Sequence, residues 1–555
     1  MDDFKIRGKI KTYIKDRIHK GLSDYINKYE NDSRYLLYYP LIDLEMGMRE
    51  EAPESITNWN RRATVAFLID NIYKDIKNVK GYDLIEEDGF KEYRDKLYNK
   101  LNQIMQDSRT LSEIDDGSSI AKSRIEKVSA NRFKITTSLV TDKYNEEDFY
   151  FYGMDDEEVA KKDRELIKNE IAKFILKYSS SKENIRKLKR LHIDIDKEVL
   201  EYSKSQIDKD LLKLGEDLKS KVFKNINELS LVLSYLYYLA FINKFRVEIL
   251  KILGKKIELK DYLLYYDKEW VISKISEVQD IPSNRVKKII NYLINNGTQQ
   301  ILEYPLFELN DHIITIPSLI MLNDWQFSIV NGHHYNSSVD FKNKSKTISV
   351  ATEKKIINKL IDKENIVSCS GKYYEFLNDD GKKINSDIDL GIYDIKRNKL
   401  LIAECKWKEN HYYDNVLDKK YIKIQDTLNK IFKEQISKHK EYLNSKKNID
   451  FIFDNNETIK SIKENPEILY IGIDKRNQIH IEDKHMITEF MLASFIDTYS
   501  KGNDLNLELL FRKIDSLQTK VEYFSIDDEK VIKIGDDTEI LIDKCELNLN
   551  YTFNE

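Results

Sequence analysis

Hydrophobic residues in the first half of the chain recur at helical spacing. Amphipathic stretches of this kind cover 63–76, 161–178 and 199–214, and each predicts a helix with one buried face. The stretch 228–241 (ELSLVLSYLYYLAF) is apolar on every side and predicts a helix that is buried all round. A polar stretch rich in Ser and Asp at 111–120 predicts a loop. We therefore expect residues 1–260 to form a helical domain.

The middle of the chain shows two short helical patterns followed by two short strand patterns. These four elements are expected at 271–278, 285–294, 302–305 and 312–316. Two helices and a hairpin in this order resemble a winged helix, a module that often lays its second helix on DNA. Arg285, Lys287 and Lys288 would supply the positive charge. The alternative is a helical connector, at 265–340, that packs the two halves of the chain together.

From about residue 345 the pattern changes to the alternation of β-structure. The runs 388–393 and 400–407 are rich in β-branched and apolar residues, and they flank a polar turn segment at 394–399. Folding this hairpin about the middle of its turn sets Asp389 opposite Glu404, 15 residues later in the chain. Directly opposed residues share a face and have Cβ atoms about 5 Å apart.

The hairpin therefore gathers two carboxylates and one ammonium. Because side chains alternate along a strand, Glu404 and Lys406 share a face, while Ala403, Cys405 and Trp407 point the other way. Two carboxylates at this separation repel unless a cation lies between them. Hard oxygen ligands suit Mg²⁺ or Mn²⁺, and a main-chain carbonyl at or near Cys405 is the expected third ligand.

Such a cluster favours phosphodiester chemistry. A divalent ion lowers the pKa of bound water and stabilises charge on a reacting phosphodiester. A lysine beside it orients the attacking water or neutralises developing charge. The alternative is a surface hairpin in which Lys406 forms a cross-strand ion pair with Glu404 or Asp389. The acidic residues interrupt apolar strand runs such as LLIAE, where a solvated ion pair has little reason to lie, and this favours the metal site.

These three residues resemble the motif of the PD-(D/E)xK nuclease superfamily, which has the restriction-endonuclease-like fold. Asp389 matches the motif aspartate, Glu404 the second acid and Lys406 the lysine. The resemblance covers roughly residues 345–480. It implies a mixed sheet flanked by helices, with the hairpin at its centre, and a catalytic role for all three side chains.

The resemblance also implies an acidic residue from the helix that precedes the hairpin. The stretch 351–360 predicts that helix, with Thr352 as its N-cap. Glu353 is the natural candidate for a catalytic or metal-binding role, and Glu364 and Glu375 are weaker ones. The alternative is that each of them is a solvated charge.

A long helix is expected after the hairpin, at 419–443. Its buried stripe comprises Ile424, Leu428, Ile431, Phe432, Ile436 and Leu443. Gln435 and His439 fall inside that stripe, where polar groups need partners. Many members of the superfamily carry a glutamine on this helix and a second polar residue one turn later, both directed at the active site. Gln435 with Lys438 or His439 is similar to that element; the alternative is that these side chains bond to a loop.

The remaining patterns complete an α+β multidomain architecture. A core strand is expected at 468–473, a helix at 486–499, and short strands at 521–524, 531–534 and 540–542. The division expected is a helical domain at 1–260, the winged-helix-like module at 265–340, an α/β nuclease-like domain at 345–500 and a small β extension at 501–555.

Composition narrows the class of protein. The 555 residues are 41% hydrophobic and carry a net charge of −5, which argues against a uniformly basic nucleic-acid binder but leaves 91 Lys and Arg for a local basic surface. No apolar run approaches the length of a membrane span, no signal peptide is recognisable, and three cysteines make no disulfide framework, so a cytoplasmic protein is expected. No GxxxxGK[ST] motif occurs, which argues against ATP hydrolysis by this chain, and neither GxSxG nor HExxH occurs.

The sequence therefore predicts a Mg²⁺- or Mn²⁺-dependent endonuclease that cuts double-stranded DNA. Lys408, Lys419, Lys420 and Lys423 are the expected phosphate contacts beside the motif. The large helical region suggests regulation by a partner protein, such as an ATPase or a sensor, in a bacterial defence or restriction-type system. The alternatives are a catalytically silent DNA-binding or scaffold subunit with the same fold, and a ribonuclease of the same superfamily.

Overall fold

The computed structural model divides the chain into two compact units. The first comprises Met1–Asp115, Lys162–Lys344 and Asn410–Asn415, and the second comprises Asp116–Lys161, Ser345–Glu409 and Val416–Glu555. The structure describes residues 3–29, 32–50, 56–73, 81–115, 124–129, 131–142, 169–211, 214–298, 300–323, 325, 328–329, 338–378, 380–406, 426–453, 465–474, 479–534 and 538–553. Within these residues no helix is long and apolar enough to cross a membrane.

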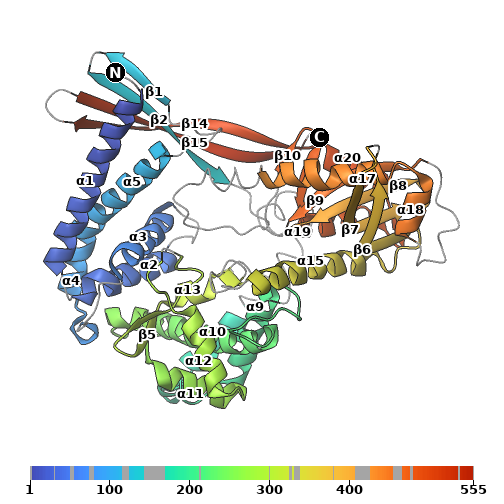
Figure 1. The fold of residues 1–555 in the computed structure, drawn as a ribbon. Coiled ribbons are helices and arrows are strands. Elements are labelled where there is room, and N and C mark those ends of the chain that lie inside the picture. Colours follow the sequence, from blue (N-terminus) through green and yellow to red (C-terminus); the bar gives the residue numbers. More distant parts are fainter. Residues whose placement is uncertain are drawn as a thin grey trace. The chain divides into compact units, whose positions relative to one another are not determined.

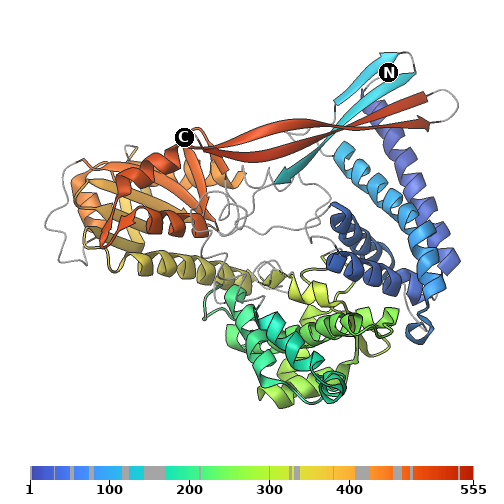
Figure 2. The same cartoon turned by 180° about the vertical axis from the view of Figure 1, so that it is seen from behind.

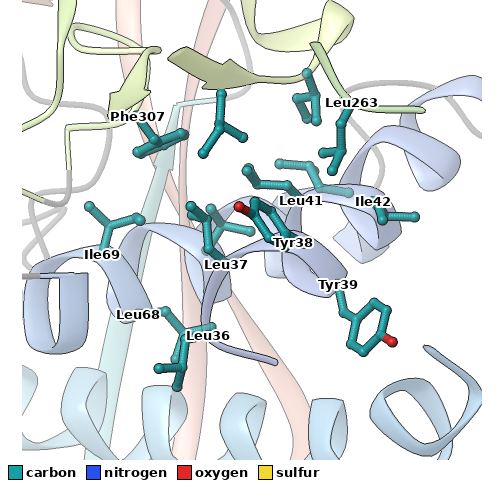
Figure 3. Packing of buried hydrophobic residues seen from close by; sticks show 14 of the residues in the cluster. Leu36, Leu37, Tyr38, Tyr39, Leu41, Ile42, Leu68, Ile69, Leu263 and Phe307 are labelled. Atoms are coloured by element: carbon teal, nitrogen blue, oxygen red, sulfur yellow. The ribbon is translucent and has the colours of Figure 1, made fainter. Parts of the chain in front are cut away.

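The first unit is mainly helical (Figure 1). Its N-terminal elements are α1 (Asp3–Tyr29), η1 (Arg34–Tyr38), α2 (Tyr39–Glu50), α3 (Ile56–Ile72), η3 (Tyr82–Leu84), α4 (Glu87–Glu92), η4 (Tyr93–Leu97) and α5 (Tyr98–Asp115). They are followed by α8 (Lys182–Leu188), α9 (Lys197–Leu211) and α10 (Ile226–Ile252). Leucine, isoleucine and tyrosine side chains of η1, α2 and α3 pack with Leu263 and Phe307 in its core (Figure 3).

Several predicted helices of this unit are confirmed. The predicted helix 199–214 corresponds to α9, and the apolar stretch 228–241 lies inside α10, where residues 232–243 are buried on all sides. The predicted loop at 111–120 is wrong for its first five residues, which extend α5 to Asp115. Polar residues are tolerated in a helix that exposes one face, so polarity alone did not mark the helix end.

A small three-stranded sheet follows α10. The chain passes through η6 (Leu259–Tyr262), β3 (Leu264–Asp267), α11 (Lys268–Gln279), α12 (Ser283–Leu293), β4 (Phe307–Leu309), β5 (His312–Thr315) and α13 (Pro317–Met321). The strands are ordered β3-β5-β4, and both pairings are antiparallel. The predicted strand at 302–305 is wrong: the chain turns at 301–304, and the strand begins two residues after Pro305, which has no N–H to donate.

The second unit contains a six-stranded mixed sheet. The chain enters this unit within α15 (Ser338–Leu360), at Ser345. The elements that follow are β6 (Ile366–Leu377), β7 (Lys383–Asp394), β8 (Lys399–Cys405), η7 (Ile431–Ile436), α17 (Ser437–Tyr442), α18 (Lys446–Ile452), β9 (Glu467–Asp474), β10 (Ile479–Ile481), β11 (Lys484–Thr488) and α19 (Glu489–Thr498). The strand order is β10-β11-β9-β8-β7-β6. The hairpin β7–β8 thus lies inside the sheet, with β9 parallel to β8 and β6 antiparallel to β7.

Helices cover both faces of this sheet (Figures 1 and 2). On one face, side chains of α15, α19 and α20 (Leu507–Asp515) pack with Leu390, Leu401 and Ala403. On the other face, side chains of α17 and α18 pack with Ile388 and Ile402.

The predicted helix 486–499 is wrong at its start, because its first three residues belong to β11. Thr488 is the N-cap of α19, and its hydroxyl accepts a hydrogen bond from the Met491 N–H at 3.1 Å.

A second, four-stranded sheet joins two distant parts of the chain. It contains β1 (Arg124–Ser129), β2 (Arg132–Asp142), β14 (Leu517–Ile534) and β15 (Thr538–Phe553), in the order β1-β2-β15-β14. The two-residue strands β12 (Ser500–Lys501) and β13 (Asp504–Leu505) form a separate hairpin. The strand character predicted at 521–524, 531–534 and 540–542 is confirmed, but the predicted bounds are wrong: the first two ranges belong to the one long strand β14 and the third to its long partner β15. The helical domain predicted at 1–260 is interrupted by β1 and β2, and β2 pairs in parallel with β15.

Candidate active site

The predicted register of the central hairpin is confirmed. Leu390 pairs with Ala403 and Asp394 with Lys399, which is the register that sets Asp389 opposite Glu404 in the prediction. The regular pairing ends at Leu390, so Asp389 and Glu404 themselves lie just beyond it. The predicted alternation is also confirmed for the described residues: Ala403 and Cys405 pack in the core against α15, α19 and α20, whereas Glu404 bonds to α17 on the opposite face. Trp407 lies outside the described residues.

The two carboxylates and the ammonium meet at the end of the β7–β8 pairing. Lys406 Nζ lies 3.0 Å from Glu404 Oε2 and 3.6 Å from Asp389 Oδ2. Asp389 Oδ2 also accepts a hydrogen bond from the Cys405 N–H at 2.8 Å. The Glu404 side chain is 1% exposed and that of Lys406 is 32% exposed, so the lysine lies on the solvent side of the cluster.

Burial and mutual repulsion perturb the acids. The pKa of Asp389 is raised to about 6, first by burial and then by the Glu404 carboxylate, while Lys406 and the Cys405 N–H oppose the rise. Burial would lower the pKa of Lys406, but the Glu404 and Asp389 carboxylates outweigh it and leave that pKa above its ordinary value. The ammonium therefore stays protonated and holds the carboxylates together.

Glu353 on α15 belongs to the same electrostatic cluster. It is 7% exposed, and its pKa is raised to about 7, first by burial and then by the carboxylates of Asp389, Asp387 and Glu404; Lys406 opposes this rise. The predicted placement of this acid near the hairpin motif is thus met by the structure. Its role as a ligand or catalyst stays a prediction.

Three other expectations around this helix have different outcomes. Thr352 is not an N-cap: it lies within α15, and its hydroxyl donates to the Ile348 carbonyl at 3.1 Å. The amide of Asn503 donates to Glu364, and exposed Glu375 is paired with Lys383. The weaker candidates Glu364 and Glu375 are therefore committed to partners outside the cluster.

The raised pKa of Glu353 predicts how stability depends on pH. At pH 8 the folded protein carries this buried charge at a cost, whereas near pH 4.5 the carboxyl is protonated in the folded state and costs nothing. We expect Glu353→Gln to raise the free energy of unfolding by about 2 kcal/mol at pH 8, a gain that fades as the pH falls through 7 towards 4.5. Urea denaturation of the metal-free protein at both pH values measures it.

The matched control is Glu375→Gln, which removes an exposed and favourably paired carboxylate and should not stabilise the protein at pH 8. Equal effects of Glu353→Gln at pH 8 and pH 5 would contradict a role of the buried charge.

The helix after the hairpin brings His439 to the carboxylates. A single helix is predicted at 419–443. The described part of this range contains the π-helical η7 followed by α17. His439 is fully buried; its Nε2 lies 2.6 Å from Glu404 Oε1, and its Nδ1 lies 2.6 Å from the hydroxyl of Tyr374 on β6. Gln435 is half-buried on η7, and among the described contacts no hydrogen bond joins it to the carboxylates. Of the predicted pair, His439 alone bonds to the motif.

Tyr374 is the member of the site that sequence reasoning missed. It lies in the alternating stretch KYYEFL of β6, where a tyrosine is an ordinary strand residue. Its ring stacks on that of Tyr442 with centroids 3.9 Å apart and planes 9° apart. No local signal in the sequence distinguishes it from the exposed Tyr373 beside it.

The donor set of the cluster fits a hard divalent cation in part. Asp389 and Glu404 offer carboxylate oxygens, and Glu404 Oε2 is buried with no hydrogen-bond donor in good geometry, although the Lys406 ammonium lies close by. Burial raises the pKa of the Cys405 thiol well above its ordinary value, so Cys405 offers its main-chain carbonyl and not its sulfur. Within the described residues no three side chains of His, Cys, Asp and Glu converge as a ready metal site, so water would complete the coordination of Mg²⁺ or Mn²⁺.

Two of the basic side chains expected to contact DNA are engaged by carboxylates of the protein. Arg285 makes two hydrogen bonds to Glu228 of α10, at 2.9 and 2.7 Å, and Lys287 pairs with Glu269 of α11 at 2.6 Å. Lys288 is exposed on the same helix. Lys408, Lys419, Lys420 and Lys423 lie outside the described residues.

Comparison with known proteins finds no match: no family model, no curated protein and no solved structure is similar to the chain.

Proposed function

We propose that the second unit is a divalent-metal-dependent endonuclease that cleaves phosphodiester bonds in DNA. The observation that carries the proposal is the meeting of Asp389, Glu404 and Lys406 at one point of the central hairpin, with the ammonium 3.0 and 3.6 Å from the two carboxylates. The order of a helix, three antiparallel strands, a helix and a parallel strand supports it, because the motif resemblance implies a mixed sheet with this hairpin inside.

Each residue has a distinct part in this proposal. Asp389 and Glu404 would hold Mg²⁺ or Mn²⁺ with the Cys405 carbonyl, and the bound ion would stabilise charge on the phosphate. Lys406, protonated and a third exposed, would orient the attacking water or neutralise the developing charge. Glu353, with a pKa of about 7, can exchange a proton with that water near neutral pH.

The first unit is proposed to bind or restrain the substrate and to receive a regulatory partner protein in the cytoplasm. The pair of helices α11 and α12, followed by the β4–β5 hairpin, supports the winged-helix interpretation of this region. Arg285 is better suited to holding α12 on α10 than to holding phosphate, because Glu228 occupies its guanidinium.

We expect Arg285→Ala to destabilise the protein without weakening DNA binding. Loss of the two bonds to half-buried Glu228 should lower the free energy of unfolding by about 1 kcal/mol. Fluorescence anisotropy with a DNA duplex, in Ca²⁺ and over a range of salt, should give the wild-type affinity and slope. The control Lys288→Ala, on the exposed face of α12, should leave stability unchanged. A salt slope flattened by about one phosphate contact in Arg285→Ala would instead place the guanidinium on DNA.

Incubation of supercoiled plasmid with the full chain tests the proposed activity. We expect nicked or linear product in Mg²⁺ or Mn²⁺ and none in EDTA. Replacing the plasmid with RNA separates a deoxyribonuclease from a ribonuclease. Binding of plasmid without cleavage in either metal would favour the alternative of a catalytically silent DNA-binding subunit.

A further inference from the structure

We propose that His439 and Tyr374 form a positioning relay that fixes the orientation of Glu404 and directs one of its oxygens to the bound cation. This inference rests on the proposed function, since it assigns a purpose to residues behind the proposed metal ligand. Neither residue touches substrate in this proposal, and both act through Glu404.

Three buried polar groups form one continuous chain of contacts. The Tyr374 hydroxyl lies 2.6 Å from His439 Nδ1, and His439 Nε2 lies 2.6 Å from Glu404 Oε1. His439 is fully buried, Glu404 is 1% exposed and Tyr374 is 2% exposed. A polar group in such surroundings costs free energy unless it is bonded, so these contacts leave each group few other orientations.

With the Glu404 carboxylate ionised and the His439 imidazole neutral, the chemistry of the three groups sets the direction of the hydrogen bonds. An ionised Glu404 can only accept, so His439 Nε2 must donate its proton to Oε1. In a neutral imidazole the other nitrogen is then an acceptor, so the Tyr374 hydroxyl donates to Nδ1. The tyrosine therefore selects the histidine tautomer that can hold the carboxylate.

This arrangement assigns the two oxygens of Glu404 to different tasks. Oε1 is held by His439 of α17, while Oε2 lies 3.0 Å from the Lys406 ammonium, which also lies 3.6 Å from Asp389. Rotation of the carboxylate about its last bond would break the 2.6 Å contact. The oxygen that faces the proposed cation is thus held in place before the cation binds.

The packing explains why the relay itself is rigid. Tyr374 comes from β6 and stacks on Tyr442 of α17, with planes 9° apart, so the strand that supplies the hydroxyl is packed on the helix that supplies the imidazole. The π-helical η7 ends three residues before His439. A π-turn contains more residues than an α-turn and so changes the direction in which the following side chains point.

Calorimetric titration of Mn²⁺ into the full chain tests the relay without requiring cleavage. We expect His439→Ala to bind Mn²⁺ about 10- to 100-fold more weakly than the wild type, the usual effect of removing such a partner of a ligand. His439→Gln should bind within about threefold of the wild type, because its amide can donate to Glu404 and accept from Tyr374. Tyr374→Phe should fall between them, since the stack on Tyr442 remains and the tautomer is no longer selected.

The matched control is Tyr393→Phe, which removes another buried hydroxyl from the same sheet. That hydroxyl bonds to Asn398 at the turn end of the hairpin, and its loss should leave Mn²⁺ affinity unchanged. Melting curves of each metal-free variant establish that the titrations are made on folded protein. Rescue by glutamine is the result that a merely structural histidine would not produce.

The outcomes separate the relay from the proposed function. Wild-type affinity in His439→Ala, or equal losses in His439→Gln and His439→Ala when both are folded, would overturn the relay. Absence of Mn²⁺ binding by the wild type would overturn the metal site itself, and with it this inference.

Discussion

Asp389→Asn is expected to abolish metal-dependent cleavage and to leave the fold intact. Asparagine keeps an oxygen that can accept the Cys405 N–H, so the strand pairing survives, but it removes the charge that binds the cation. The rate of plasmid cleavage should fall by at least about 10²- to 10³-fold, the size of effect seen when one preorganised electrostatic contact is lost. A time course of plasmid cleavage at saturating Mg²⁺ measures the loss.

The same substitution should stabilise the metal-free protein at pH 8. The pKa of Asp389 is raised to about 6, so at pH 8 the folded protein carries its charge at a cost that asparagine removes. We expect a gain of about 1 to 2 kcal/mol in the free energy of unfolding. Glu375→Gln, on the neighbouring strand β6, is the control and should cleave at the wild-type rate. Wild-type cleavage by Asp389→Asn would show that this carboxylate is not a catalytic ligand.

Lys406→Met is expected to lose most of the cleavage rate and to retain metal binding. The ammonium contacts both carboxylates, and in the proposed mechanism it acts on water or on the developing charge, so its loss should slow the chemical step by about 10²- to 10³-fold. Mn²⁺ affinity should stay at the wild-type level or rise, because the ammonium no longer competes for the same oxygens. Single-turnover cleavage and calorimetric titration measure the two effects.

In EDTA this variant should be less stable than the wild type. Removing the ammonium leaves two buried carboxylates facing each other, which should cost about 1 to 2 kcal/mol, and added Mg²⁺ should recover the loss. Lys399 lies at the other end of β8 and forms an ion pair with Glu467 of β9. Lys399→Met breaks this pair and should affect neither the cleavage rate nor the Mn²⁺ affinity. Joint loss of metal binding and activity in Lys406→Met would indicate a structural ion pair.

Local periodicity was enough to predict the motif hairpin. Its turn and its side-chain alternation are properties of adjacent residues, so Asp389, Glu404 and Lys406 could be brought together from the sequence before any other contact was known. The apolar helix α10 was predictable for the same reason, since a segment without a polar face has to be buried. The start of β4 was not predictable from the sequence, because an apolar run does not show which of its residues pair with another strand.

The sequence by itself thus determined the chemistry of the hairpin and the helical character of most of the first unit. The motif resemblance offers Glu353 and His439 as candidates, but only the tertiary structure decided which distant residues complete the cluster, and it alone added Tyr374. Tyr374 and His439 are 65 residues apart, and their contact depends on how α17 packs on β6. The pairing of β2 with β15 joins strands about 400 residues apart, and the burial that raises the pKa of Glu353 depends on the docking of α15 on the sheet. Such contacts depend on packing between elements, and neither the spacing nor the chemistry of neighbouring residues encodes them.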